Sequence, residues 1–347
     1  MSRPLNIVWF KRDLRVADHR PLVEAVKLGP ILPLYIVEPD LWAQPDSSAR
    51  QWAFAAESLR ELQGELAGLG QPLCVMVGDS VSIFQEIHKR YGVASLWSHE
   101  ETGNGWTYAR DLAVSAWAKA EGVPWREPRQ FGIIRRLKSR NGWANAWDRS
   151  MAEPVNAPPV TLQPIDGDWP THIPTFSELG LAADPCPYRQ PGGRTAALTT
   201  LESFLGERGR EYRYQMSSPV TAFDACSRLS PHLTWGTISM REVSHATLKR
   251  IRAISHLNDP VSKSWRASLI SFMGRQHWHC HFMQKLEDEP RLNFKTSIAP
   301  MMGFAPISLT RSGFLPGGQG RRDSPSLTPV CARSISMDGS ISGCGPC

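Results

Sequence analysis

Over the first 135 residues, short apolar runs alternate with segments that carry apolar residues at helical spacing. The apolar runs have the length of strands and stand at residues 5–10, 31–39, 72–78 and 94–99, with a weaker fifth at 123–129. Helical patterns separate them at Ser47–Leu69, with Ser48 as the expected cap, and at Ser80–Tyr91 and Gly105–Glu121. This alternation predicts right-handed βαβ units and an α/β doubly wound parallel-sheet domain over residues 1–135.

The strands of such a sheet are covered on both faces, so they can be continuously apolar. We therefore expect six strand residues to be buried: Val8, Ile31, Leu34, Ile36, Val75 and Leu96. Ligands of this fold bind beyond the carboxyl ends of the strands.

The pattern changes twice beyond this domain. Residues 151–194 contain nine prolines, which cannot donate to a helix or sheet ladder, so we expect an interdomain linker over residues 136–194 that runs along a surface. Helical spacing then returns at 195–209, 239–254 and 262–290 without any strand pattern. Residues 195–293 are therefore expected to form an incomplete all-α domain.

The last part of the chain differs in composition. In residues 295–347, Gly, Pro and Ser make up 23 of 53 positions, and Trp, Tyr and Glu do not occur. This composition predicts a disordered tail over residues 294–347. Half of the net charge of +6 comes from this segment, so overall basicity is a weak argument for a nucleic-acid partner.

Composition also limits the class of protein. No apolar run reaches membrane-spanning length, and the first residues do not form a signal peptide. Seven cysteines are an odd number at scattered positions, which fits a reducing cytoplasm better than a disulfide framework. We expect a cytoplasmic monomer without membrane contact.

Two segments carry candidate binding chemistry. Trp9–Arg15 follows the first strand, where Lys11, Arg12 and Arg15 are expected to meet an anion or the other domain, or to form a solvated basic turn. Cys226–Ser239 places two serines around Arg228 and before Pro231, which would suit a phosphate group at a helix start. The alternative for that segment is an ordinary Ser-capped helix.

Two other motifs suggest metal or redox chemistry. His277, Cys280 and His281 share a helix, but no partner stands at metalloprotease spacing, so packing around a pocket is favoured and no metal is expected. Cys344–Cys347 has the spacing of a thioredoxin-type motif, but no helix follows to lower a thiol pKa. A metal or redox protein is therefore the weakest of the hypotheses.

Three stretches together resemble one family. Residues 8–22 (VWFKRDLRVADHRPL) are similar to the opening of the DNA photolyase/cryptochrome family, and 227–242 to its flavin-phosphate segment. Residues 265–290 resemble the next active-site helix in a bacterial photolyase-like branch. With the same domain order, the resemblance covers residues 3–293. It implies FAD in the helical domain, an antenna chromophore of unknown identity in the first domain, and DNA containing pyrimidine dimers as partner.

The resemblance also implies roles for single residues. Tyr212 or Tyr214 would approach the flavin phosphates, and Ser227–Ser230 match the phosphate segment, with Cys226 where many members have Thr. Within Ser227–Ser230 the matching residues are Ser227, Arg228, Leu229 and Ser230. Arg275, Trp278 and His279 would line the flavin and lesion pocket as catalytic residues. Arg275 stands roughly where many repair enzymes carry an acidic residue. This weakens the argument for dimer repair more than the argument for flavin binding.

Family members continue beyond this length with helices that complete the flavin cavity. Codons for residues 295–309 and 328–347 can be chosen so that reading one base earlier gives family-like sequence, which predicts a one-base slip near Arg291–Phe294. The coding DNA tests this directly. We therefore expect a blue-light-driven, FAD-dependent photolyase or cryptochrome-like photoreceptor that is inactive as truncated. The alternative is a non-catalytic remnant whose α/β domain binds a nucleotide-like chromophore or nothing.

Overall fold

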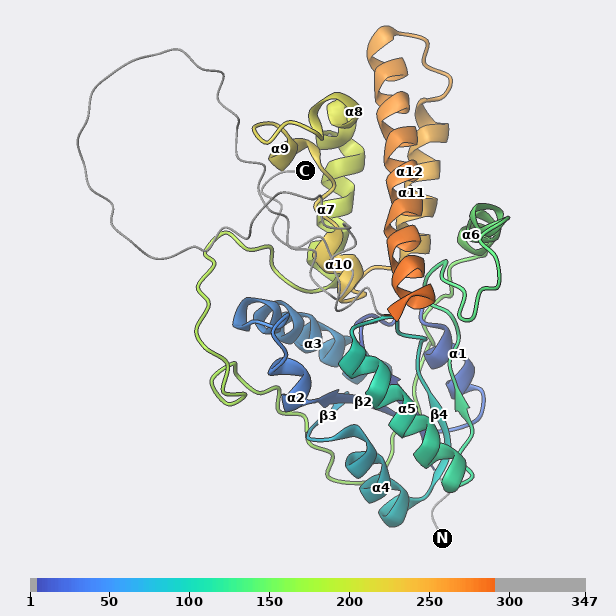
Figure 1. Cartoon of the computed structure of the whole chain (residues 1–347), viewed down its shortest axis with the longest axis vertical. Coiled ribbons are helices and arrows are strands. Elements are labelled where there is room, and N and C mark those ends of the chain that lie inside the picture. Colours follow the sequence, from blue (N-terminus) through green and yellow to red (C-terminus); the bar gives the residue numbers. More distant parts are fainter. Residues whose placement is uncertain (1–4, 291–347) are drawn as a thin grey trace, which may run out of the picture.

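A computed structural model describes residues 5–290 of the chain (Figure 1). Five parallel strands form one sheet in the order β3-β2-β1-β4-β5. The strands are β1 (Leu5–Phe10), β2 (Ile31–Val37), β3 (Cys74–Val77), β4 (Val93–Trp97) and β5 (Trp125–Arg126). The strand order reverses at β1, which creates a switch point between the carboxyl ends of β1 and β4.

Helices cover both faces of this sheet, which confirms the predicted doubly wound α/β fold. Helices α1 (Arg20–Val26) and α3 (Ala49–Leu69) pack on one face, and α4 (Ser80–Tyr91) and α5 (Gly105–Ala120) on the other. The short helix α2 (Pro39–Trp42) follows β2. All six strand residues expected in the core are buried, and Ser48 accepts a hydrogen bond from the Gln51 amide as the cap of α3.

The second part of the chain is helical, as expected. Its elements are α6 (Trp143–Ala152), α7 (Arg194–Gly206), the 3-10 helix η1 (Arg208–Glu211), α8 (Tyr212–Gln215), α9 (Ala222–Ala225), α10 (Ser230–Thr234), α11 (Met240–Ile254) and α12 (Pro260–Asp288). One apolar core joins them. Helix α6 falls inside the segment assigned to the linker, and its residues Trp143, Trp147 and Met151 belong to this helical core.

Residues 153–193 contain neither helix nor strand and run along the α/β domain. Arg189 pairs with Glu57 of α3, and the Gly193 amide donates to Ser58 Oγ at 2.9 Å. Farther back, the Val75 amide donates to the Pro170 carbonyl at 2.7 Å. The linker is therefore held against the sheet domain by its own hydrogen bonds.

The two parts meet where the loop after β1 touches the turn between α10 and α11. The Leu14 amide donates to the Trp235 carbonyl at 3.0 Å, and Arg15 Nη1 donates to the Gly236 carbonyl at 2.8 Å. The rings of Trp42 and Trp235 stack with centroids 5.5 Å apart. Arg15 is fully enclosed in this seam, so of the alternatives for the basic loop, contact with the other domain holds for Arg15.

No helix within residues 5–290 is long and apolar enough to cross a membrane. The expected tail at 294–347, the reading-frame slip and the Cys344–Cys347 motif lie outside the described residues.

Candidate functional site

Hydrogen bonds to its backbone carbonyl groups fix the segment between α9 and α10. Arg208 donates to the carbonyls of Asp224 at 2.9 Å, of Cys226 at 2.7 Å and of Ser227 at 3.4 Å. Gln190 Nε2 donates to the Arg228 carbonyl at 2.7 Å. With its carbonyls bound on one side, the segment can present its amides on the other.

The amides of residues 227–230 donate to no acceptor within residues 5–290. Arg228 has φ 61°, in the left-handed region, and the next residue, Leu229, is right-handed with φ −89° and ψ −6°. Alternating left- and right-handed residues turn successive N–H groups into one concavity, which binds anions. A non-glycine residue in the left-handed region is uncommon, and among residues 5–290 only Asp18, Arg136 and Arg228 adopt it.

The side chains add to this concavity, which we call the cradle (residues 227–230). The Arg228 guanidinium lies 4.2 Å from the ring centroid of Phe223, and Ser230 is exposed. Leu229, not a serine, caps α10, and it makes no side-chain capping bond. The ordinary Ser-capped helix is therefore the wrong interpretation of this segment, and the serine hydroxyls remain available to a ligand.

Of the two tyrosines expected near this segment, only one belongs to the packed site. Tyr212 is buried against Phe204 and Phe272, at 5.5 and 5.8 Å between ring centroids, and burial raises its pKa to about 12. Cys226 and Arg275 lie close enough to influence that pKa. Tyr214 is 64% exposed.

Helix α12 separates the three residues expected to be catalytic. Arg275 is exposed and reaches Met216 Sδ at 4.0 Å, and its guanidinium lies 5.9 Å from the Trp278 ring. Trp278 is 52% exposed. His279 instead turns toward the α/β domain, 5.6 Å from Phe131, and burial lowers its pKa to about 4. Trp278 therefore lies beside Arg275, whereas the neighbouring His279 contacts Phe131.

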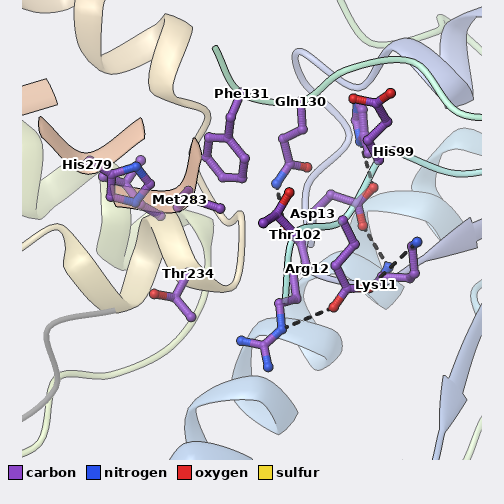
Figure 2. A pocket seen from close by; sticks show the side chains of 13 residues that line it. Lys11, Arg12, Asp13, His99, Thr102, Gln130, Phe131, Thr234, His279 and Met283 are labelled. Atoms are coloured by element: carbon purple, nitrogen blue, oxygen red, sulfur yellow. Dashed lines mark hydrogen bonds and ion pairs between the residues drawn. The ribbon is translucent and has the colours of Figure 1, made fainter. Parts of the chain in front are cut away.

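His279 lines a small cavity in the seam between the two parts (Figure 2). The enclosed space is about 20 Å³, room for a single water. Gln130 Oε1 and Thr234 Oγ1 are buried there and find no hydrogen-bond partner in the described part of the chain. Sequence analysis missed this cavity because its lining comes from five separate segments of the chain.

Asp13 organises the α/β side of that cavity. Its Oδ2 accepts from His19 Nε2 at 2.8 Å and from His99 Nδ1 at 2.7 Å, and its Oδ1 accepts from the Lys11 amide. Burial by itself would raise the pKa of Asp13, but His19 and then His99 hold it well below its usual value. Burial, helped by His19, lowers the pKa of His99 to about 3.

Asp13, His19 and His99 are the one group of metal-type ligands that residues 5–290 bring together. His19 Nδ1 accepts from the Leu22 amide, which can only donate. His19 Nε2 must then carry the proton that it donates to Asp13, so it has no lone pair for a cation. The residues fit a hydrogen-bonded cluster and do not fit a metal. His277, in contrast, pairs with Asp148 at 2.8 Å.

Ion pairs fill the switch point where doubly wound folds bind ligands. Arg110 of α5 donates to Glu38 at 2.7 Å and to Glu101 at 2.6 Å, and Lys11 pairs with Asp111 at 3.2 Å. Burial opposes ionisation of Glu101, but Arg110 and Lys11 lower its pKa to about 2. This crevice is therefore packed with side chains that satisfy one another, and Lys11 meets carboxylates of its own domain.

Comparison with known proteins agrees with this architecture. A family model described as DNA photolyase matches residues 6–131. A deoxyribodipyrimidine photo-lyase of Halobacterium salinarum is 25% identical over 81% of the chain, and a bacterial class III photolyase structure from Agrobacterium tumefaciens superposes with a TM-score of 0.67 at 26% identity over 84% of the chain. The chain is similar to photolyases and cryptochromes, and its first 131 residues carry the match to the DNA photolyase family model.

Cryptochromes match as well as photolyases. Cryptochrome-1 of Arabidopsis thaliana is 28% identical over 73% of the chain. An archaeal photolyase structure from Sulfolobus tokodaii, described with two FAD molecules, shares the fold at a TM-score of 0.62 and 21% identity, over 83% of this chain and 60% of its own. The chain spans 61% of the length of the Halobacterium enzyme, 39% of the Arabidopsis cryptochrome and 60% of the Agrobacterium structure. It therefore covers less than two thirds of each.

Proposed function

We propose that the cradle holds the diphosphate of FAD and that the chain derives from a blue-light-driven photolyase or cryptochrome-like photoreceptor. The observation that carries the proposal is the row of four amides that find no acceptor among residues 5–290, shaped by the left-handed backbone at Arg228. A diphosphate would supply oxygens to these amides, to the Ser227 and Ser230 hydroxyls and to the Arg228 guanidinium. The residues present fit the phosphate end of the cofactor.

When bound and reduced, FAD supplies the electron that repair enzymes of the family pass to a pyrimidine dimer in DNA. This chain's own residues would bind and orient. Arg208 fixes the cradle by donating to its carbonyl groups. Buried Tyr212 keeps its hydroxyl protonated at neutral pH. Trp278 presents an indole face to a flavin or a flipped base, with Arg275 beside it. His279 is neutral and faces the seam, so its part in our proposal is to position α12 against the α/β domain.

The described residues would cover the rings of the cofactor less completely than its phosphates. Along α12, three large apolar side chains are exposed: Ile270 by 57%, Trp278 by 52% and Phe282 by 48%. At about 25 cal/mol per Å², several hundred Å² of ring and helix surface left in water forfeits on the order of 10 kcal/mol. Phosphate contacts, each about 1.5–3 kcal/mol, do not restore that. We propose that the 347-residue chain binds FAD weakly, purifies nearly colourless and does not repair dimers.

Neither the switch point nor the seam has room for an antenna chromophore. Ion pairs fill the switch point, and the seam encloses room for one water. We derive no light-harvesting step through such a group.

The proposal is tested by comparing ligands that share the ring or the phosphates. Titrate the 347-residue chain with FAD, riboflavin and ADP, and follow flavin fluorescence and heat of binding. FAD and ADP should bind and compete, because both carry the diphosphate, whereas riboflavin should bind at least about tenfold more weakly. Equal binding of FAD and riboflavin would refute the cradle. No binding of any of the three would support the non-catalytic remnant.

A further inference from the structure

Helices α11 and α12 meet at the end of the helical part that lies farthest from the sheet (Figure 1). The sequence around this end is rich in basic residues. Between Lys249 and Arg275 there are six basic residues and one acidic residue, Asp259. We call this the basic end, made of Arg210, Arg213, Lys249, Arg250, Arg252, Lys263 and Arg266. None of these seven forms an ion pair with any residue in 5–290.

Several arginines elsewhere in the described chain are paired. Arg110, Arg189, Arg194 and Arg241 each pair with a carboxylate, at 2.7 Å or closer for their shortest bond. Single arginines without an ion pair also occur outside the basic end, as at Arg90, but the basic end gathers five of them with two lysines. A surface selected only for solubility usually mixes both signs of charge, so this imbalance points to an anionic partner.

The centre of the basic end is a tryptophan held between two arginines. The guanidinium carbons of Arg250 and Arg210 lie 4.1 and 4.8 Å from the Trp265 ring centroid. Trp265 is 6% exposed, and its Nε1 and Arg250 Nε are buried donors without an acceptor. Stacking on the indole restricts both guanidinium groups and leaves their outer nitrogens without a carboxylate. The arrangement fits phosphate oxygens, which arginine binds in a bidentate way.

We propose that the basic end is a second nucleic-acid contact that binds the phosphate backbone of duplex DNA without regard to sequence or lesion. Five of its seven residues are arginine, the side chain best suited to phosphate. Trp265 and Trp278 are 13 residues apart on α12, about 20 Å at 1.5 Å per residue, so this contact lies away from the pocket-lining residues. The choice of DNA as partner rests on the proposed function.

The test uses undamaged 20-base-pair duplex in the dark, without flavin, and fluorescence anisotropy at a series of salt concentrations. Because no lesion or cofactor is involved, its result is independent of the FAD titration. Arg210→Gln with Arg250→Gln should weaken binding about tenfold and reduce the slope of log affinity against log salt by about 2. The matched control is Lys89→Gln with Arg90→Gln, two exposed and unpaired residues on α4, which should leave the slope unchanged.

A second double variant protects the test against misfolding. Lys249→Gln with Lys263→Gln changes two exposed residues and leaves the arginines that stack on Trp265 in place, and it should reduce the slope by a similar amount. Equal losses in the basic-end and α4 variants would show that only net charge matters and would overturn the proposal. So would unchanged duplex binding in both basic-end variants, or a loss confined to binding of phosphatidylglycerol vesicles. The vesicle result would assign the surface, with exposed Leu257 and Val261 beside it, to a membrane.

Discussion

Replacing Gly236 with alanine should lower the free energy of unfolding both by straining the backbone and by disrupting the seam between the two parts. Comparison with a control glycine separates the two contributions. Gly236 has φ 62°, and a Cβ there would overlap the Arg12 carbonyl oxygen and lie 2.5 Å from Asp13 Cα. Both neighbours are backbone and cannot rotate away. The loop after β1 must therefore move from the turn before α11.

The magnitude follows from the contacts that would be disturbed. A Cβ in the left-handed region costs roughly 1–2 kcal/mol. The Leu14–Trp235 bond is worth about 1 kcal/mol, and the charged bond from Arg15 to the Gly236 carbonyl about 1.5–3 kcal/mol. We therefore expect Gly236→Ala to lower the free energy of unfolding by about 3–6 kcal/mol. Urea unfolding monitored by tryptophan fluorescence measures this, since the Trp42–Trp235 stack lies in the seam.

The control is Gly122→Ala. Gly122 has φ 68°, but a Cβ there meets nothing within 4 Å in the described structure. It reports backbone strain alone, about 1–2 kcal/mol. If Gly236→Ala costs no more than Gly122→Ala, the loop after β1 does not hold the two parts together as described.

Two further predictions concern pH and proteolysis. Burial lowers the pKa of His232 to about 4, below its usual 6.5, so the folded state keeps it neutral while the unfolded state gains a proton as pH falls. Stability should decline from about pH 6.5 to 4, by about 3 kcal/mol for this residue, and His232→Asn should flatten that decline in urea midpoints measured across the range. Limited proteolysis should cut within residues 153–193 and leave an N-terminal fragment, since this segment has neither helix nor strand. First cleavage inside Ile31–Glu38 would count against the sheet.

Much of the fold could be predicted from sequence, because the strands and long helices have strong periodicity. The strand at 5–10 and the helix at 80–91 match β1 and α4 in both bounds. Helix α1 was missed because it has only seven residues, and α6 because its tryptophans stand among the irregular segments around the linker. The strand expected at 123–129 shrinks to two residues, since only 125 and 126 find partners on β4.

The candidate site was only partly predictable. The Ser227–Ser230 segment could be found by its residue types, but its shape depends on Arg208 and Gln190, which bind it from other elements. The left-handed backbone at Arg228 has no signal in the sequence, because arginine rarely adopts it. For His279 the residue type was easy to find, but the direction of its side chain was not. One residue along a helix turns a side chain by about 100°, so neighbours in sequence face different parts of the protein.

The most direct test of the central claim is the affinity of FAD for Arg228→Gly. Glycine adopts the left-handed backbone without strain, so this variant removes the guanidinium and leaves the cradle's shape. Arg136→Gly is the matched control, since Arg136 is an exposed arginine with φ 56° outside the cradle. Isothermal titration should show that Arg228→Gly weakens FAD binding about 10–100-fold, equivalent to about 1.5–3 kcal/mol, while Arg136→Gly changes it less than about twofold. Equal affinities in the two variants would contradict the assignment of the cradle to the flavin diphosphate.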